Sequence, residues 1–476
     1  MTAAAPSQNT TPTRPAREDT FAALRNSNFR LYFAGQLVST AGTWMQNVAQ
    51  AVLVVALIIK LTHSAEQSSL WLGIVACAAG LPLVLLSPLT GVIVERIPRR
   101  RIMLVTQTTQ MLLAFVLAGL AFADLVQVWH VVLLAFLLGI TNAVDQPSRQ
   151  AFIVEMVGRK EMQSGIQLNS ILVSASRAIG PALAAIALTV VGTGWCFMLN
   201  GFSFMAVIAS LLIMKVPYAI PPTKNARPLR QMREGLHYVV TDGGMILPLL
   251  LLTSTVGLFG LPLVQFYAAF AATALNSPNN GYSAIIIAQG IGSVLAGALI
   301  GWLTFRLGRG RTIAVGVIVI AVVNVLMTRQ VYIPGAVVFS FLSGLAIVSS
   351  VISINTGIQT LVPDQLRGRV LSLYTLAFFG LSPFGALIAG FIASGIGGFS
   401  GIGTANAMLL YAVLGGVFGT LIVIRWPAVL TIGREAPHVS KDAAAIIEAD
   451  AEAASAPAAV RIRTDTGSQM PGVSDR

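Results

Sequence analysis

Long stretches without Asp, Glu, Lys or Arg alternate with short basic segments along most of the chain. A helix that crosses a bilayer needs about 20 largely apolar residues, so each uncharged stretch indicates how many helices it can hold. Stretches with room for one helix lie at 31–59, 67–94, 102–123, 125–144, 312–328 and 330–363. Three longer ones hold two helices each, because a turn signal rich in Gly or Asn lies inside them. These are 162–214 (interrupted only by Arg177), 243–305 and 370–424, with turn signals at 192–194, 276–281 and 395–403. The pattern predicts an all-α membrane protein with twelve transmembrane helices in two pseudo-symmetric halves of six.

The composition agrees with this prediction and excludes most soluble classes. Hydrophobic residues make up 55% of the 476 residues, charged residues only 10%, and the mean hydropathy is +0.79. Soluble domains carry about 25% charged residues. The net charge of +12 would suit an anionic polymer, but the basic residues cluster between the apolar stretches, where membrane topology explains them. We expect the lipid bilayer and a small-molecule substrate as partners, no nucleic acid, and a monomer.

The distribution of Lys and Arg predicts the orientation of the helices, because cytoplasmic loops accumulate positive charge. With both termini in the cytoplasm, nearly all of the 30 Lys and Arg residues lie on the cytoplasmic side. The exceptions are Lys60 and Arg329 on the opposite side and Arg177 within a helix. We therefore expect a multi-pass protein of the cell (inner) membrane with both termini cytoplasmic.

The same pattern predicts the domain organisation. We expect a disordered cytoplasmic tail at 1–29, a six-helix half at 30–216, a cytoplasmic linker at 217–244, a second six-helix half at 245–426 and a disordered cytoplasmic tail at 427–476. Within the linker, Leu229, Met232, Leu236 and Val240 share one face of a helix at 228–240. This is typical of an interfacial helix at the inner headgroups.

A motif after the predicted second helix recurs after the eighth. Gly91-x-x-x-Glu95-Arg96-x-x-Arg99 has the same spacing as Gly301-x-x-x-Phe305-Arg306-x-x-Arg309. Duplicated six-helix halves produce such a repeat. The motif resembles the GxxxDRxGRR signature between helices two and three of the major facilitator superfamily, with Glu95 in place of the Asp and Pro98 in place of the glycine.

Further motifs at 145–150, 177–183, 233–236 and 363–369 resemble the drug-efflux and siderophore-export branch of that superfamily, related to macrolide and enterobactin exporters. The resemblance covers roughly residues 25–430. It implies two halves that alternate access to a midplane site, and a bend in helix five at Gly180-Pro181 of the kind associated with antiporters. It also implies a cytoplasmic gate formed by Gly91, Glu95, Arg96, Arg99, Gly301 and Arg306. The arginines from Arg99 to Arg101 have an alternative interpretation, in which they only fix topology.

Helix one carries a polar face. Its members are Gln36, Thr40, Thr43, Asn47 and Gln50, which are spaced so that all share one side of a helix. This side cannot face lipid without cost, so it either lines a wet cavity or forms interhelical hydrogen bonds, each worth about 0.6 kcal/mol. The resemblance implies the cavity, because helix one lines the central pathway in that superfamily. Further candidates for the cavity wall are Asn142, Ser174, Phe259, Gln265, Gln289, Ser349, Ser353 and Phe378.

Ionisable residues inside membrane helices are costly and mark functional sites. Asp145 lies about four residues from the expected end of helix four, Arg149 follows one turn later, and Arg177 lies near the middle of helix five. Asp145 can pair with Arg177 or with Arg149. A buried carboxylate that is released and protonated during the cycle would couple protons to transport, whereas a permanent Asp145–Arg149 pair would be structural. Arg177 can alternatively bind an anionic substrate.

We therefore predict a secondary transporter that exports a hydrophobic or amphipathic, drug-like molecule by proton antiport. The alternatives are export of an anionic siderophore or secondary metabolite, and import. An enzyme is not expected, because the four histidines form no HExxH motif and no GxxxxGKT loop is present. Cys77 and Cys196 match no ligand spacing, so we expect two free thiols, no metal and no cofactor, with the proton gradient as energy source.

Overall fold

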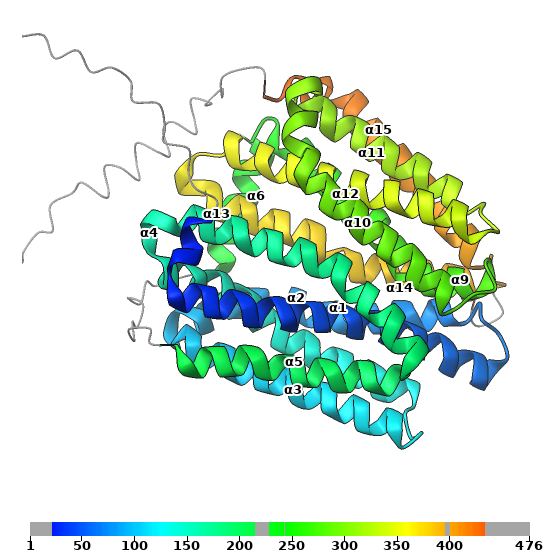
Figure 1. Cartoon of the computed structure of the whole chain (residues 1–476). Helices are drawn as coiled ribbons and strands as arrows, with labels where there is room; N and C mark the ends of the chain where they lie inside the picture. The colour runs from blue at the N-terminus through cyan, green and yellow to red at the C-terminus, as the bar shows by residue number, and fades with distance from the viewer. Residues whose placement is uncertain (1–20, 215–227, 242, 396–399, 434–476) are drawn as a thin grey trace, which may run out of the picture. The chain divides into compact units, whose positions relative to one another are not determined.

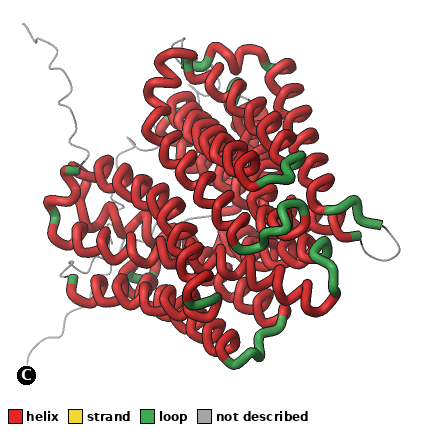
Figure 2. The backbone as a smooth tube through the Cα atoms, turned by 45° about the vertical axis from the view of Figure 1, so that its right-hand side comes forward, coloured by secondary structure: helices red, strands yellow, loops and turns green. Residues whose placement is uncertain are grey.

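The computed structural model describes residues 21–214, 228–241, 243–395 and 400–433. Within these ranges all regular secondary structure is helical, as Figure 1 and Figure 2 show. Twelve helical segments of the described residues are long and apolar enough to cross a membrane. The predicted fold class, an all-α protein with twelve transmembrane helices, is confirmed.

The first six spans come from five continuous helices. A short 3-10 turn η1 (Ala22–Arg25) precedes α1 (Ser27–Thr62), α2 (Ser68–Arg96), α3 (Arg99–Phe122), α4 (Val128–Val190) and α5 (Thr193–Ile213). The helix α4 holds two spans, Val128–Gly158 and Glu161–Val190. They meet at Gly158, whose φ of 72° and ψ of 175° break the helix in a way that suits glycine.

The second six spans are more interrupted. The helices are α6 (Pro228–Thr241), α7 (Ile246–Thr255), α8 (Leu261–Gln265), α9 (Tyr267–Thr273), α10 (Asn280–Leu307), α11 (Arg309–Met327), α12 (Ile333–Leu361), α13 (Asp364–Thr375), α14 (Ser382–Ser394) and α15 (Thr404–Arg425), followed by the 3-10 turn η4 (Pro427–Thr431). A π-helical turn, η2 (Val256–Gly260), joins α7 to α8, and a second, η3 (Leu376–Gly380), joins α13 to α14.

A proline follows each π-helical turn, Pro262 in α8 and Pro383 in α14. Proline has no N–H to donate to the carbonyl four residues earlier, which favours the wider turn before it. The two turns pack together, because a Cβ added to Gly257 would lie 2.5 Å from the carbonyl oxygen of Ala377. The seventh and eleventh spans therefore approach each other backbone to backbone where both are irregular.

Consecutive spans alternate in direction, so the bundle of residues 21–433 has two ends. We call them the α6 end, where α6 joins the sixth span to the seventh, and the α9 end, where α9 follows the seventh span (Figure 1). At the α9 end a hydrophobic core is shared by both halves: it includes Val48–Ile58 of α1 and Phe266–Phe270 around α9. At the α6 end a separate core around Phe29, Phe152 and Ile153 belongs to the first half.

The two halves also meet along α2 and α14, through small residues. An added Cβ at Gly73 would lie 2.5 Å from the carbonyl oxygen of Ala386, and one at Gly390 would lie 2.6 Å from that of Ser69. A Cβ added to Gly80 would likewise collide with the ring of Pro383. We call this contact the α2–α14 seam. Small residues let transmembrane helices approach closely, so the seam holds the halves together by backbone packing.

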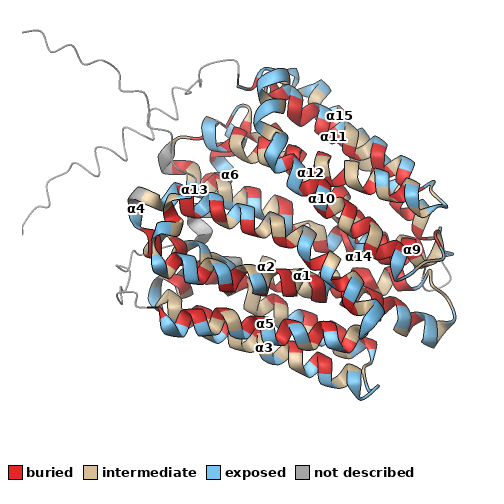
Figure 3. Ribbon diagram, in the orientation of Figure 1, coloured by how far each residue is buried: buried red, intermediate tan, exposed pale blue. Residues whose placement is uncertain are grey.

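The outward faces of the helices are apolar. In Figure 3 the exposed residues follow the outer sides of the ribbons. On α3 they include Val105, Leu112 and Val116, each more than half exposed, and on α15 they include Leu421 and Ile424. A soluble protein would bury such side chains, whereas a bilayer solvates them.

One segment differs in detail from the sequence prediction. The first span of α4 continues to Gly158, well beyond the end expected near Arg149, because Phe152, Ile153 and Met156 recur at helical spacing and are buried against the first half. The uncharged stretch thus ends at Val144, but the helix continues beyond it.

The linker helix α6 forms as expected, over Pro228–Thr241. Its described apolar residues divide between two faces. Tyr238 and Val239 are buried, whereas Leu236 and Val240 are 53% and 62% exposed, as a face that meets headgroups would be. The Glu234 carboxylate forms an ion pair with Arg369, with Oε2 and Nη1 3.4 Å apart, and this pair connects α6 to α13.

Candidate functional site

Asp145 lies in the centre of a polar cluster between α3 and the first span of α4. Its side chain is completely buried. Thr106 donates to Oδ1 at 2.6 Å, Gln107 donates to the same oxygen at 3.0 Å, and Arg149 pairs with Oδ2. Both carboxylate oxygens are therefore occupied by donors, which compensates for burying the charge.

Tyr32 of α1 borders the cluster and makes no hydrogen bond to it. Its ring packs edge-on against Phe152, with the ring centroids 6.1 Å apart. Its buried hydroxyl has no hydrogen-bond partner, although it lies close enough to Asp145 and Arg149 to interact with their charges. This hydroxyl and the buried Nε of Arg149 are therefore polar atoms of the cluster that remain without a hydrogen bond.

Arg177 lies apart from this cluster, on the second span of α4. Its guanidinium carbon is 5.1 Å from the ring centroid of Trp44 on α1, a cation–π contact, and its Nε is buried without a partner. No ion pair of the described residues includes Arg177. Of the two pairings that the sequence left open for Asp145, the structure contains the one with Arg149.

The Gly180-Pro181 element brings α4 against α1. Helical φ and ψ angles continue through both residues, so the helix is not interrupted there. An added Cβ at Gly180 would collide with Trp44 and would lie 2.7 Å from the carbonyl oxygen of Ala41. The glycine therefore sets how closely α4 approaches α1, and it places Trp44 beside Arg177.

The polar face of α1 divides among several environments. Thr43 and Gln50 line a cavity of about 10 Å³ inside the first half, at the lower limit for one water molecule. Gln36 is buried and donates to Thr40 at 3.1 Å within the helix. Asn47 is exposed. This face thus forms a hydrogen bond within α1, borders a cavity at Thr43 and Gln50, and is accessible at Asn47.

The same cavity is lined by three polar residues that the sequence pattern did not single out, Gln46, Gln110 and Asn200. Asn200 of α5 donates to Gln46 of α1 at 2.7 Å, and both side chains are buried. Gln110 of α3 donates to Asn142 of α4 at 3.3 Å. These pairs continue the polar layer from Asp145 towards the α9 end, through α1, α3, α4 and α5.

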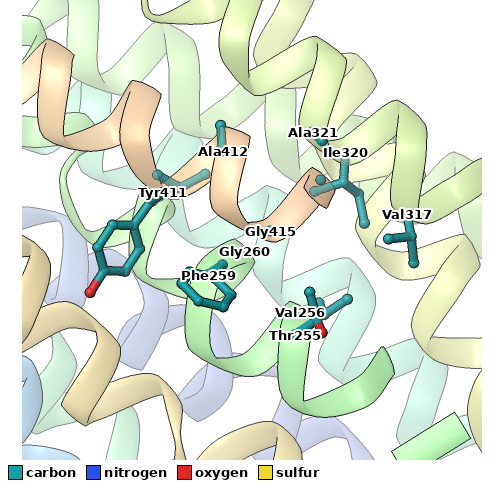
Figure 4. A pocket seen from close by; sticks show the side chains of 12 residues that line it. Thr255, Val256, Phe259, Gly260, Val317, Ile320, Ala321, Tyr411, Ala412 and Gly415 are labelled. Atoms are coloured by element: carbon teal, nitrogen blue, oxygen red, sulfur yellow. The ribbon is translucent and has the colours of Figure 1, made fainter. Parts of the chain in front are cut away.

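In the second half, Phe259 lies in a small pocket enclosed by η2, α11 and α15 (Figure 4). Its ring centroid is 5.5 Å from that of Tyr411 and 5.6 Å from that of Phe418. The pocket has a volume of about 20 Å³ and an almost entirely apolar lining. Phe259 is thus packed within its own half in this conformation.

The other predicted wall residues differ in burial and in the contacts that they make. Phe378 stacks on Tyr374 at 6.2 Å within η3 and α13. Ser349 and Ser353 are buried on α12, and the hydroxyl of Ser353 has no partner. Gln289 is half-buried and Gln265 exposed. The side chain of Ser174 lies outside the described part of the structure.

The predicted gate residues lie at the α6 end. Arg99 pairs with Glu155 on the extension of α4, and Arg100 donates to the carbonyl oxygens of Leu211 and Leu212 at the end of α5. Both arginines are therefore engaged within the first half.

The remaining gate positions make fewer contacts. Arg96 is exposed, and Gly301 borders open space. The guanidinium of Arg306 lies 5.9 Å from the ring centroid of Trp302. The side chain of Glu95 and the surroundings of Gly91 lie outside the described part of the structure.

Comparison with known proteins connects this architecture to one family. Residues 18–431 match the model of a family described as transmembrane secretion effectors. Macrolide efflux protein A of Streptococcus pyogenes is 24% identical over 383 residues, which cover 78% of this chain and 91% of the relative. The multidrug efflux pump Tap of Mycobacterium tuberculosis is 24% identical over 427 residues, covering 85% and 95%. The staphyloferrin A transporter of Staphylococcus aureus is 22% identical over 192 residues, covering 40% and 46%.

Solved structures share the fold at low sequence identity. The crystal structure of a D-xylose–proton symporter superposes with a TM-score of 0.65 and 12% identity, covering 88% of this chain and 99% of the symporter. A bacterial homologue of the human lysosomal transporter Spinster, in an inward-facing and unoccupied conformation, gives a TM-score of 0.56 and 15% identity, covering 84% and 98%.

Proposed function

The chain belongs to the transmembrane secretion effector family of the major facilitator superfamily, a family of transporters and not of enzymes, and from this premise we propose that it exports a hydrophobic or amphipathic small molecule in exchange for protons. It is a multi-pass membrane protein. The efflux activity named for its macrolide and multidrug relatives supports the direction. We place the protein in the inner membrane with the α6 end in the cytoplasm, because Lys and Arg concentrate there.

The observation that carries the proposal is the buried Asp145–Arg149 pair with its two donors on α3. A charge at membrane depth is expensive and is retained where it serves a pathway. Uptake of a proton by Asp145 removes its charge and weakens its hold on Arg149. Return of the ion pair expels the proton. Thr106 and Gln107 keep the carboxyl oriented throughout, and the hydroxyl of Tyr32 is placed to accept from Arg149 while the pair is open.

Alternating access follows from how the halves are joined. Their shared core lies at the α9 end, whereas the described contacts of Arg99 and Arg100 at the α6 end stay within the first half. With the α6 end in the cytoplasm, this arrangement suits the conformation that takes up substrate from inside. The outward conformation then requires the α2–α14 seam to part near Gly390 and the arginines to engage the second half.

The test uses inverted membrane vesicles with an imposed proton gradient and a panel of cationic dyes, macrolides and catecholates. We expect gradient-driven accumulation of at least one compound, collapsed by an uncoupler. Asp145→Asn, which keeps the shape and loses the charge, should abolish it. Asp124→Asn is the matched control, because Asp124 is exposed at the α9 end and Asn tolerates its φ of 55°. Full proton-driven transport by Asp145→Asn would refute the coupling assignment.

A second candidate, export of an anionic siderophore-like compound, rests on Arg177. A half-buried guanidinium whose enclosed Nε has no partner, and which has no described acidic partner, can bind a carboxylate or catecholate. Similarity to the staphyloferrin A transporter agrees with this class. In the same vesicles, Arg177→Lys and Arg177→Ala should reduce transport of anionic compounds at least tenfold more than that of cationic ones. Equal losses for both charge classes would exclude this candidate.

A further inference from the structure

A carboxylate of the first half caps a helix of the second half at the α9 end. Glu66 lies in the short connection between α1 and α2, and α15 begins at Thr404. The backbone N–H of Thr404 donates to Glu66 Oε2 at 2.6 Å, and the Thr404 hydroxyl donates to the same oxygen at 2.7 Å. The hydroxyls of Ser69 and Thr404 lie 2.8 Å apart. Three hydrogen bonds between the halves thus converge on Thr404.

The helix α15 depends on this contact for its cap. Its N-cap residue, Gly403, has a φ of 82° and no side chain to accept from the first turn. Glu66 supplies the missing acceptor from across the interface. A negative charge at a helix N-terminus is also stabilised by the helix dipole, so an ionised carboxylate binds this position more strongly than a neutral one.

The surroundings make Glu66 the charge that decides the strength of this contact. The helices packed around it, α2 as far as Leu86, α14 and α15 as far as Ile424, contain no Asp, Glu, Lys, Arg or His. On its own connection the ionisable neighbours are Lys60 and His63, both exposed. No second carboxylate of the described first turns of α2 and α15 can replace Glu66 when it is protonated.

The contact lies where the two halves must separate when the α9 end opens. It lies beside the end of the α2–α14 seam, where Gly390 meets Ser69 and Leu70, and beside the core that both halves share. Parting of the halves at the α9 end must break all three hydrogen bonds at Thr404. The contact is therefore made in the α9-closed conformation and lost in the α9-open one.

We propose that Glu66 is a proton-sensitive latch that holds the α9 end closed through Thr404. As a carboxylate, Glu66 accepts from the N–H and the hydroxyl of Thr404 and holds the halves together. When a proton binds one carboxyl oxygen, the charge and its attraction to the helix N-terminus are lost, and opening becomes easier. The inference rests on the alternating access proposed above. It assigns to the outer side a second proton-responsive group, distinct from Asp145.

The experiment measures the distance between spin labels across the α9 end of the full-length protein in lipid nanodiscs. The labels replace Leu61, which is 67% exposed at the end of α1, and Asn406, which is exposed on the first turn of α15. The background carries Cys77→Ser and Cys196→Ala. We expect mainly the short distance at pH 8, and a long-distance population that grows at pH 4, because the helix N-terminus favours the charged carboxylate and protonation therefore needs a low pH.

Glu66→Gln should show the long-distance population already at pH 8, increased roughly two- to thirtyfold over wild type, and should lose the pH response. Thr404→Val, which keeps the backbone N–H, should give a smaller increase. Asp124→Asn and His63→Asn are matched controls at the same end and should keep the wild-type response. His63 adopts a φ of 54°, which Asn accommodates.

The latch is overturned if Glu66→Gln keeps the wild-type pH response. It is also overturned if His63→Asn abolishes that response. A wild-type protein whose distances do not change with pH overturns it as well. A second spin-label pair, with both labels in the first half, is the folding control. Only variants in which this pair gives the wild-type distance are compared. The measurement uses no substrate, so absence of transport in vesicles would refute the proposed function and leave the latch to be judged by distance alone.

Discussion

Gly73 gives the sharpest prediction about the α2–α14 seam. In Gly73→Ala the new methyl group would lie 2.5 Å from the carbonyl oxygen of Ala386 and 3.1 Å from the Cα of Leu387. Both are backbone atoms of α14, so no side chain can rotate away. The seam must widen by several tenths of an ångström, which costs about 1–3 kcal/mol by analogy with overpacked cores. In the alternating access proposed above, opening of the α9 end separates these atoms, so we expect the α9-open population to rise about 5- to 150-fold.

The assay measures how often the α9 end opens. Ala268, 1% exposed in the shared core, is replaced by Cys in the background without Cys77 and Cys196. A small membrane-impermeant maleimide then reacts only with molecules whose α9 end is open, so its labelling rate reports the open population. In Gly73→Ala we expect this rate to rise by the factor given above, with little loss of the folded state.

Gly297→Ala is the matched control for this assay, because an added Cβ at Gly297 meets nothing within 4 Å. Both substitutions replace glycine within a transmembrane helix and gain similar helix propensity. A labelling rate in Gly73→Ala equal to that in Gly297→Ala would show that the seam does not resist opening. The contact would then be a passive boundary between the halves.

Two further predictions concern stability in detergent. Asn200→Ala leaves Gln46 buried without its partner and should lower the free energy of unfolding by about 1–3 kcal/mol, measured by thermal unfolding; an unchanged midpoint would mean that water replaces the amide in the adjoining cavity. Arg177→Met removes a half-buried cation with no described counter-charge and should raise stability by on the order of 1 kcal/mol, despite loss of the Trp44 contact. A destabilised Arg177→Met would indicate that Arg177 is a structural residue.

The sequence predicted the spans well because the bilayer imposes one strong constraint, a minimum length of apolar helix. Turn signals that need a positive φ were equally informative: Gly192, Asn276 and Gly403 have φ values of 86°, 48° and 82°. The end of the first span of α4 was placed too early, because Phe152 and its neighbours pack a helix that continues past the apolar stretch.

The candidate site was only partly predictable. Asp145 and Arg149 were found because a charge in or beside an apolar stretch is conspicuous, and their pairing follows from one helical turn of spacing. Their partner Thr106 was missed because uncharged polar residues are common in membrane helices. Its spacing of three or four residues from Met103 and Gln110, which share its buried face, was the available signal.

The contact between Glu66 and Thr404 could not have been predicted from sequence spacing. The two residues lie in different halves, and nothing local indicates that the first turn of α15 lacks its own cap until the φ of Gly403 is known. Contacts of this kind depend on how the halves dock. Single-sequence patterns contain no information about that.

The two π-helical turns show that the duplicated halves have diverged in helix geometry. The spans that correspond by repeat, α1 and the second span of α4, run without such turns, whereas η2 and η3 interrupt the seventh and eleventh. Substitutions near η2 or η3 can therefore reshape one wall of the transporter while the Asp145 cluster in the other half stays intact. With the coupling proposed for Asp145, such a division would allow the range of exported compounds to change during evolution while that cluster is kept. We expect drug-selected variants of this chain to accumulate first around Phe259 and Phe378.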